Sequence, residues 1–121
     1  MVLYVLELEE NKVRKARLED YMEVIYALIS LVEPGKVTTY GSIAKLLGIS
    51  PRLVGKIMAA NKSPIVIPCH RVVKSNGDLG GYSRGGVKIK KRLLELEGVV
   101  FSRGEVVDKK CIIDLKELLD P

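Results

Sequence analysis

Apolar residues alternate with other residues at the start of the chain and then change their spacing. Every second position is apolar through Val2, Tyr4, Leu6 and Leu8, a polar turn follows at 10–12, and the chain returns over 13–17. This pattern predicts a short β-hairpin over residues 1–17. From Leu18 to Val32 the apolar spacing becomes three and four, which predicts an amphipathic helix that stops before Pro34-Gly35.

Two short helices are expected in the middle of the chain. The first covers residues 41–47 and closes at Gly48, which suits a helix C-cap. Ser50-Pro51 provides a hydroxyl cap and a first-turn proline for the second, which runs to Ala60. Two short helices joined by a tight turn form a helix-turn-helix. Such a pair either binds DNA or packs in an ordinary core, and the pattern alone leaves both open.

The second of these helices has two distinct faces. Its inner stripe is apolar, and its outer face carries Arg52, Gly55, Lys56 and Ala59. Glycine costs about 1 kcal/mol relative to alanine inside a helix, so another group is expected to approach closely at Gly55. Small residues flanked by two cations favour a nucleic-acid groove. Helix–helix packing through the same small residues is the alternative.

The rest of the chain predicts one mostly α domain with short β elements over residues 18–121. A strand is expected at 65–67, a glycine-rich loop at 74–86, two short strands around 102–104 and a helical turn at 115–119. A helix is expected over 87–97, with Ile89, Leu93 and Leu96 facing inward. Its cations would mostly face outward, namely Lys88, Lys90, Lys91 and Arg92.

Composition limits the classes of function. A net charge of +5 and a pI near 9.2 favour a polyanionic partner without locating a site. Two cysteines and one histidine cannot supply four zinc ligands, so we expect no structural zinc. We also expect no other metal and no cofactor. No apolar run approaches the roughly 20 residues of a membrane span, and the start does not resemble a signal peptide. We therefore expect a cytoplasmic protein with reduced cysteines.

The chemically informative stretch is Pro68-Cys69-His70-Arg71, after the apolar residues 65–67. A neighbouring imidazole or cation favours the nucleophilic thiolate form of a cysteine. Pro68 is expected to end the strand and present Cys69 at a rim, where His70 reaches the sulfur if the chain turns or a water bridges them. The alternative is a small buried cysteine, which is the interpretation we give to Cys111. Glu97 ends a helix where the dipole disfavours an anion, so His70 is its expected partner.

These residues, in this order, resemble the O6-alkylguanine-DNA alkyltransferases (methylated-DNA–protein-cysteine methyltransferases). The resemblance covers about residues 18–99 and includes Thr39-Tyr40-Gly41, residues 52–55, Asn61, residues 65–73, Gly81-Tyr82-Ser83 and residues 93–98. It implies a winged helix-turn-helix-like C-terminal alkyltransferase domain. It also implies a suicide reaction without a cofactor, in which the cysteine takes the alkyl group from O6 of a flipped guanine.

The resemblance assigns a role to each matching residue. Cys69 would be the nucleophile, which His70 deprotonates through a water while Glu97 orients the imidazole; Tyr40 would donate to the leaving guanine and help to rotate the target phosphate. Arg52 would fill the gap left by the flipped base. The other DNA-binding residues would be Gly55, Lys56, Ala59, Arg71 and Asn61, of which Asn61 would brace the turn after the recognition helix. Tyr82 and Ser83 would line the base pocket.

The sequence departs from the family in length. Typical members have a substantial domain before the first shared helix, where this chain has residues 1–17, and the segment 82–86 is one residue longer than usual. The short form resembles alkyltransferase-like lesion sensors, but those carry another residue, commonly Trp, at the position of Cys69. We expect a monomer that binds the minor groove of duplex DNA containing O6-alkylguanine, at the nucleoid and away from membranes. A non-catalytic lesion sensor and a plain helix-turn-helix regulator are the alternatives.

Overall fold

The computed structural model describes residues 4–7, 12–63, 65–82, 84–103 and 106–119. Five α-helices, two 3-10 helices and three two-stranded sheets lie within these residues. In chain order the elements are β1 (Tyr4–Glu7), β2 (Lys12–Lys15), α1 (Leu18–Ile29), β3 (Thr38–Thr39), α2 (Tyr40–Leu47), α3 (Pro51–Ala59), η1 (Cys69–Arg71), β4 (Val72–Val73), α4 (Gly86–Leu96), β5 (Phe101–Ser102), β6 (Val106–Val107), η2 (Lys109–Cys111) and α5 (Leu115–Leu119). The expectation of a mostly α fold with short β elements is confirmed.

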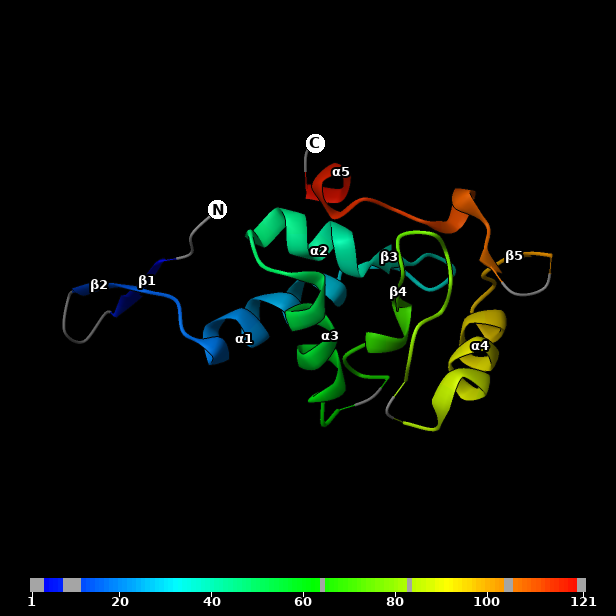
Figure 1. The fold of residues 1–121 in the computed structure, drawn as a ribbon, viewed down its shortest axis with the longest axis horizontal. Helices are drawn as coiled ribbons and strands as arrows, with labels where there is room; N and C mark the ends of the chain where they lie inside the picture. The colour runs from blue at the N-terminus through cyan, green and yellow to red at the C-terminus, as the bar shows by residue number, and fades with distance from the viewer. Residues whose placement is uncertain (1–3, 8–11, 64, 83, 104–105, 120–121) are drawn as a thin grey trace.

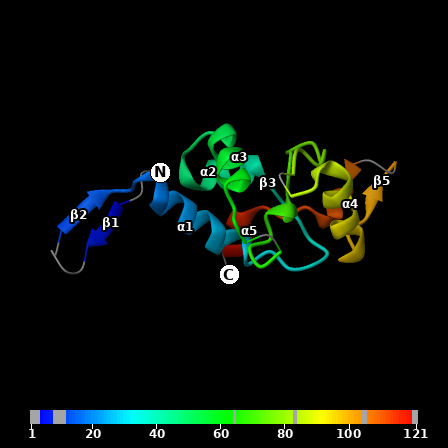
Figure 2. The same ribbon diagram turned by 90° about the horizontal axis from the view of Figure 1, so that it is seen from below.

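The N-terminal hairpin lies at one end of an elongated molecule, with α4 and β5 toward the other (Figures 1 and 2). β1 and β2 pair antiparallel with Leu6 opposite Val13, as the alternating pattern predicts. Lys12 is the first residue of β2 rather than part of the turn, and residues 8–11 lie outside the described residues. Arg14 binds both Glu7 and Asp20, so one guanidinium links the hairpin to the start of α1.

The predicted helix-turn-helix is present as α2 and α3, and its ends follow from local capping. The Thr39 side chain accepts a hydrogen bond from the Ser42 amide at 2.9 Å, so α2 begins at Tyr40, one residue earlier than expected. Gly48 ends α2 in the left-handed region, at φ +70°. The Ser50 hydroxyl accepts from the Leu53 amide at 3.1 Å and Pro51 opens α3. The inner faces of both helices pack in one core with α1 and α5, through residues such as Ile25, Ile29, Ile43, Val54, Ile57 and Leu115.

A two-residue parallel ladder joins segments that are far apart in the sequence. β3 pairs with β4 so that Thr38 lies opposite Val72 and Thr39 opposite Val73. Because β3 runs directly into α2 and β4 follows η1, the ladder brings Tyr40 to the side of the molecule that carries Cys69. The ladder thereby assembles the site from residues about thirty positions apart in the chain.

The prediction of a strand at residues 65–67 is wrong. Ile65 and Val66 lie in a turn and are 61% and 81% exposed, and Ile65 has a φ of +74°. The amide of Ile67 donates to the Ser63 carbonyl at 2.9 Å, and the Ile67 carbonyl accepts from Asn61. These bonds reverse the chain between α3 and η1, and they outweigh the strand preference of a β-branched run.

The expected orientation of the helix at 87–97 is also wrong, although the helix itself is confirmed as α4. Ile89 and Leu96 are 47% and 67% exposed, whereas Lys90 and Leu94 are fully buried. Lys90 and Leu94 are four residues apart and therefore share a face. The helix turns this face inward because the Lys90 ammonium finds hydrogen-bond acceptors there.

The C-terminal elements match the expectation. β5 and β6 pair antiparallel around Arg103, which has a φ of +55°, and α5 forms the final helical segment. Cys111 is buried in a second apolar cluster with residues such as Val37, Leu94 and Val107. Within the described part of the chain, no helix combines the length and hydrophobicity needed to cross a bilayer.

Candidate active site and DNA-binding face

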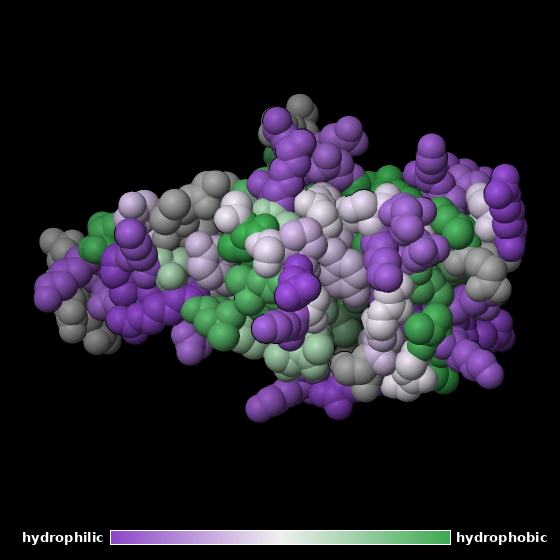
Figure 3. Space-filling view, viewed as in Figure 1, coloured by the Kyte–Doolittle hydropathy of each residue, from purple (hydrophilic) through white to green (hydrophobic). Residues whose placement is uncertain are grey.

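A pocket of about 740 Å³ opens between α3, the start of α2, η1 and the loop over residues 74–85, which we call the glycine loop. Its size lies in the usual range for small-molecule sites and exceeds that of a single nucleobase. In Figure 3 hydrophilic side chains project around an area of pale and green residues over α3 on this face. The lining residues are Tyr40, Gly41, Pro51, Arg52, Gly55, Met58, Ala59, Cys69, Lys74, Ser75, Gly80, Gly81 and Tyr82.

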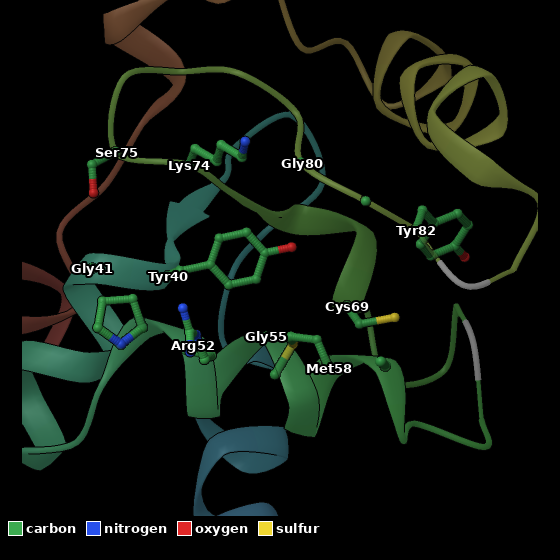
Figure 4. A pocket seen from close by; sticks show the side chains of 13 residues that line it. Tyr40, Gly41, Arg52, Gly55, Met58, Cys69, Lys74, Ser75, Gly80 and Tyr82 are labelled. Atoms are coloured by element: carbon green, nitrogen blue, oxygen red, sulfur yellow. The ribbon is translucent and has the colours of Figure 1, made fainter.

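Cys69 lies on the floor of this pocket. It is the first residue of η1, its residue surface is 5% exposed, and its sulfur points into the space beside Tyr82 (Figure 4). The Cys69 amide donates to the Ile67 carbonyl at 2.8 Å and the Arg71 amide donates to the Pro68 carbonyl at 2.9 Å. Both cysteines are free thiols. Pro68 thus presents the sulfur as expected, from a tight turn rather than from a strand.

His70 is fully buried behind Cys69, and its Nε2 lies 3.0 Å from Oε2 of Glu97. Burial lowers the pKa of His70 more than Glu97 raises it, so the imidazole is neutral at pH 7. An ionised carboxylate only accepts, so Nε2 carries the proton and Nδ1 is the basic nitrogen. Nδ1 is buried without a hydrogen-bond partner among the described residues, and it is therefore available to take a proton.

Glu97 is held by two neighbours. The Arg71 guanidinium donates to Oε2 at 2.7 Å and to Oε1 at 2.9 Å, and its third contact is the Val32 carbonyl at 2.8 Å. Burial raises the pKa of Glu97, but the bonds from Arg71 and His70 lower it below the ordinary value overall. Arg71 also supplies the positive charge that the C-terminal end of α4 lacks.

The expectation that Arg71 contacts DNA is not supported by this geometry. Its side chain is only 12% exposed and its guanidinium is occupied by Glu97 and by the Val32 carbonyl. Arg71 therefore holds the carboxylate that holds His70.

Tyr40 forms the opposite wall of the pocket from α3. Its hydroxyl points into the pocket on the side of Cys69 (Figure 4). Burial raises the pKa of Tyr40, with a further contribution from the neighbouring Cys69, so the phenol keeps its proton at neutral pH. Gly80 has a φ of +72°, and a Cβ there would lie 3.3 Å from the Tyr40 ring. A larger residue at position 80 would therefore strain the backbone and crowd this wall.

The outer face of α3 is open, as its sequence predicts. Arg52, Lys56 and Ala59 are exposed, and a Cβ added at Gly55 would meet no atom within 4 Å. The space at Gly55 is therefore not filled by another helix of the described chain, so helix–helix packing among these residues does not explain the glycine. Arg52 lies at the mouth of the pocket, below Tyr40 in Figure 4.

Asn61 holds the turn between α3 and η1. Its side-chain amide donates to the Ile67 carbonyl at 3.0 Å and its oxygen accepts from the Ser63 amide at 2.9 Å. Arg84 donates to the Asn61 carbonyl at 2.8 Å. Tyr82 lines the pocket, whereas Ser83 lies outside the described residues.

Comparison with known proteins places these residues in a family. Residues 20–99 match the model described as "6-O-methylguanine DNA methyltransferase, DNA binding domain". The chain belongs to this family. The match contains α2, α3, Cys69, His70 and Glu97, so the pocket and the residues behind it all lie within the matched region.

Relatives from the methyltransferase family are similar to part of this chain. A methylated-DNA–protein-cysteine methyltransferase of Pyrobaculum aerophilum is 48% identical over 86 residues, which are 71% of this chain and 54% of that protein. The crystal structure of O6-methylguanine-DNA methyltransferase from Pyrococcus kodakaraensis has a TM-score of 0.60 and 49% identity over 65% of this chain and 46% of that one. The chain thus spans about half the length of the methyltransferases it matches.

A shorter protein matches over nearly its whole length. The crystal structure of S. pombe Atl1 in complex with damaged DNA containing O6-carboxymethylguanine has a TM-score of 0.67 and 25% identity. That match covers 81% of this chain and 98% of Atl1. Both full methyltransferases and a short DNA-binding relative therefore share the fold of this family member.

The sequence alone did not identify Lys90 as part of this methyltransferase-family site. Its ammonium contacts Tyr40 and the glycine loop from below the pocket, but four cations within the five residues 88–92 are typical of a solvated helix face. The available signal was its place four residues before Leu94 on one helix face. Lys74, Ser75 and Met58 were also not predicted as lining residues, because only the β3–β4 ladder brings the first two beside α2.

Proposed function

We propose that this chain is a single-turnover DNA alkyltransferase that moves an alkyl group from O6 of guanine to Cys69. The observation that carries the proposal is the sulfur of Cys69 on the floor of a pocket large enough for a nucleobase, beside the open face of α3. A base in a duplex can reach that sulfur only after it has been flipped out of the stack. Because the chain spans about half of its methyltransferase relatives, their activity is carried over here as a proposal.

The reaction moves the alkyl group from the guanine oxygen to the cysteine sulfur. Nδ1 of His70 takes the Cys69 proton through a water, and Glu97 stabilises the imidazolium that forms. The thiolate attacks the alkyl carbon, a carbon–sulfur bond forms, and the carbon–oxygen bond breaks with its electron pair left on O6. A proton then restores guanine. The thioether has no easy route to hydrolysis, so each protein molecule acts once.

Three other residues prepare the base. Tyr40 donates a hydrogen bond to the guanine as negative charge develops on it, and its place at the start of α2 lets it help to rotate the target phosphate. Arg52 enters the stack where the base has left. Unstacking and unpairing cost a few kcal/mol, which the inserted side chain partly offsets.

The same face defines how the protein meets DNA. Gly55 and Ala59 leave a shallow surface on α3 that suits the minor groove, with Arg52 and Lys56 beside it. All the described residues that line the pocket come from one copy of the chain, so we infer that it acts as a monomer. As a protein that acts on chromosomal DNA, it would be associated with the nucleoid. Affinity should depend mainly on phosphate contacts and fall with salt.

The direct test is a duplex with a tritium-labelled methyl group on O6-methylguanine. We expect the label to move to the protein at one methyl group per molecule and then to stop, even with DNA in excess. Continued release of label over many turnovers would contradict the single-turnover mechanism. Unmodified guanine in the same duplex is the control.

One observation favours a second function. The chain covers 98% of Atl1, which is crystallised with damaged DNA, so a lesion sensor that binds without transfer is the competing candidate. The labelled duplex separates the two functions, because a sensor binds it and leaves the label on DNA. Cys69 with its buried histidine and carboxylate is what favours transfer.

Arg52→Ala is expected to slow transfer at saturating DNA by about tenfold to a hundredfold, because nothing then fills the stack. Lys56→Ala is the matched control on the same exposed face. It should weaken binding to modified and unmodified duplexes alike and reduce the salt slope by about one. Stopped-flow transfer rates and salt titrations measure both effects. Equal rates for wild type and Arg52→Ala at saturation would remove Arg52 from the flipping step.

A further inference from the structure

Lys90 is a fully buried cation beneath the pocket. Its ammonium donates to the carbonyls of Val72 at 2.7 Å, Leu79 at 2.5 Å and Gly81 at 3.2 Å, and it lies 3.4 Å from the Tyr40 hydroxyl. One nitrogen therefore ties together α4, β4, the glycine loop and α2. Among the described residues, no carboxylate forms an ion pair with it.

The burial of this charge is costly. Burial lowers the pKa of Lys90 to about 8, and only the neighbouring Cys69 acts in the opposite direction. A buried ion is often replaced by a packed apolar side chain without loss of stability, so stability alone is a weak reason for a lysine at this position. The charge has a more specific consequence at Tyr40.

The protonated state of Lys90 fixes the direction of the Tyr40 hydrogen bond. An ammonium has three hydrogens and no lone pair. Two hydrogens point to the Val72 and Leu79 carbonyls, and the third is shared between the Gly81 carbonyl at 3.2 Å and the Tyr40 oxygen at 3.4 Å. In this contact the Tyr40 oxygen can therefore only accept. The hydrogen of the phenol then remains free for another acceptor, and the hydroxyl points into the pocket (Figure 4). A neutral amine has a lone pair, and it can accept the phenol hydrogen and turn it away from the pocket.

We propose that Lys90 is a positioning residue that keeps Tyr40 a hydrogen-bond donor toward a base in the pocket, and that loss of its proton in alkaline solution removes this constraint. The inference rests on the proposed function in one respect, namely that a flipped base occupies the pocket. It does not require that the alkyl group is transferred.

The other titratable groups around Lys90 can be separated from it. Tyr40 and Tyr82 have pKa values raised mainly by burial, so both phenols are neutral from pH 6.5 to pH 9. Burial lowers the pKa of His70, which is present in both proteins of the test and does not affect the ratio of their affinities. Cys69→Ala removes the remaining neighbour and also the attraction that raises the pKa of Lys90. Lys74 lines the same pocket and is common to the proteins compared below.

The test compares equilibrium binding of an O6-methylguanine duplex by Cys69→Ala and by Cys69→Ala/Tyr40→Phe, from pH 6.5 to pH 9 at constant ionic strength. At pH 6.5 we expect the protein with Tyr40 to bind about tenfold more tightly, the value of one hydrogen bond. The ratio should fall toward about twofold by pH 9. A ratio that is constant with pH, or close to one throughout, would overturn the inference. Alkyl transfer by the wild type is measured separately, so a failure of the proposed transfer chemistry can be distinguished from a failure of the role proposed for Lys90.

A second comparison places Lys90→Met in the Cys69→Ala background. In that background, Tyr40→Phe should lower the affinity for the duplex only about twofold at pH 6.5. In a Lys88→Met background, where an exposed lysine of the same helix is changed instead, Tyr40→Phe should still lower the affinity about tenfold. If the effects of Lys90→Met and Tyr40→Phe on the affinity were additive, Lys90 would act independently of Tyr40, as a purely structural lysine would. That result would contradict the inference. If Lys90→Met does not fold, the pH series still decides, because it leaves Lys90 in place.

Discussion

Replacing Cys69 by alanine is expected to abolish alkyl transfer and to leave binding of lesion-containing DNA within a few-fold of the wild-type affinity. The sulfur is the group that forms the new bond, and no other free thiol lines the pocket in the described chain. In the proposed function, binding depends mainly on α3 and on the other residues that line the pocket, which the substitution leaves in place. Label transfer and fluorescence anisotropy with the same duplex measure the two quantities.

Cys111→Ala is the matched control for that experiment. Cys111 is also buried, at 4% exposed, but it packs in the other apolar cluster with Val107 and Leu94. This variant should lose some stability, of the order of 1 kcal/mol, and should transfer the alkyl group fully. If Cys69→Ala still removed methyl groups from DNA, the proposed nucleophile would be wrong.

Glu97→Gln has the second largest expected effect, on rate and stability together. The two carboxylate oxygens of Glu97 accept hydrogen bonds from His70 and Arg71, whereas a glutamine amide has only one acceptor oxygen. The substitution also removes the negative charge that stabilises the imidazolium. We expect transfer to slow by about a hundredfold. The free energy of unfolding should fall by about 3 kcal/mol, because the largely buried Arg71 guanidinium loses its partner.

The pH dependence of Glu97→Gln gives an independent check. The folded pKa of Glu97 lies below 4.5, so its contribution to stability is present above that pH and is lost as the pH falls through the folded value. The stability difference between wild type and variant, measured by urea unfolding, should therefore shrink in acid. Glu95→Gln, an exposed residue of the same helix, should change neither rate nor stability. A Glu97→Gln protein with the wild-type transfer rate would show that the carboxylate is not needed by His70.

Local signals in the sequence were sufficient for the helix-turn-helix. Ser50, Pro51 and Gly48 act through bonds and backbone angles within a few residues, so their patterns predict helix ends directly. The partnership of Glu97 with His70 was also predictable, because an anion at a helix C-terminus requires a nearby compensating group. These parts of the fold and of the candidate site depend on chemistry that a short window of sequence contains.

One error has a local cause, and another comes from a contact between distant segments. Ile65 and Val66 have strand-forming side chains, but the hydrogen bonds that Ile67 makes with Asn61 and Ser63 close a local turn around them. Lys90 was assigned to solvent because its acceptors, the Val72 and Leu79 carbonyls, come from other elements. The partner of Arg71 was not predictable either, because nothing in the local sequence shows that Glu97 lies beside it.

The central claim is that the sulfur of Cys69 becomes a stable thioether. Its most direct test is mass spectrometry of the intact protein and of its peptides after incubation with an O6-methylguanine oligonucleotide, with the unmodified oligonucleotide as the control. The proposed function predicts that the protein gains the mass of one methyl group in place of one hydrogen, and that fragmentation places the methyl group on Cys69. An unchanged mass after the protein has bound the lesion, or a methyl group on any other residue, would contradict it.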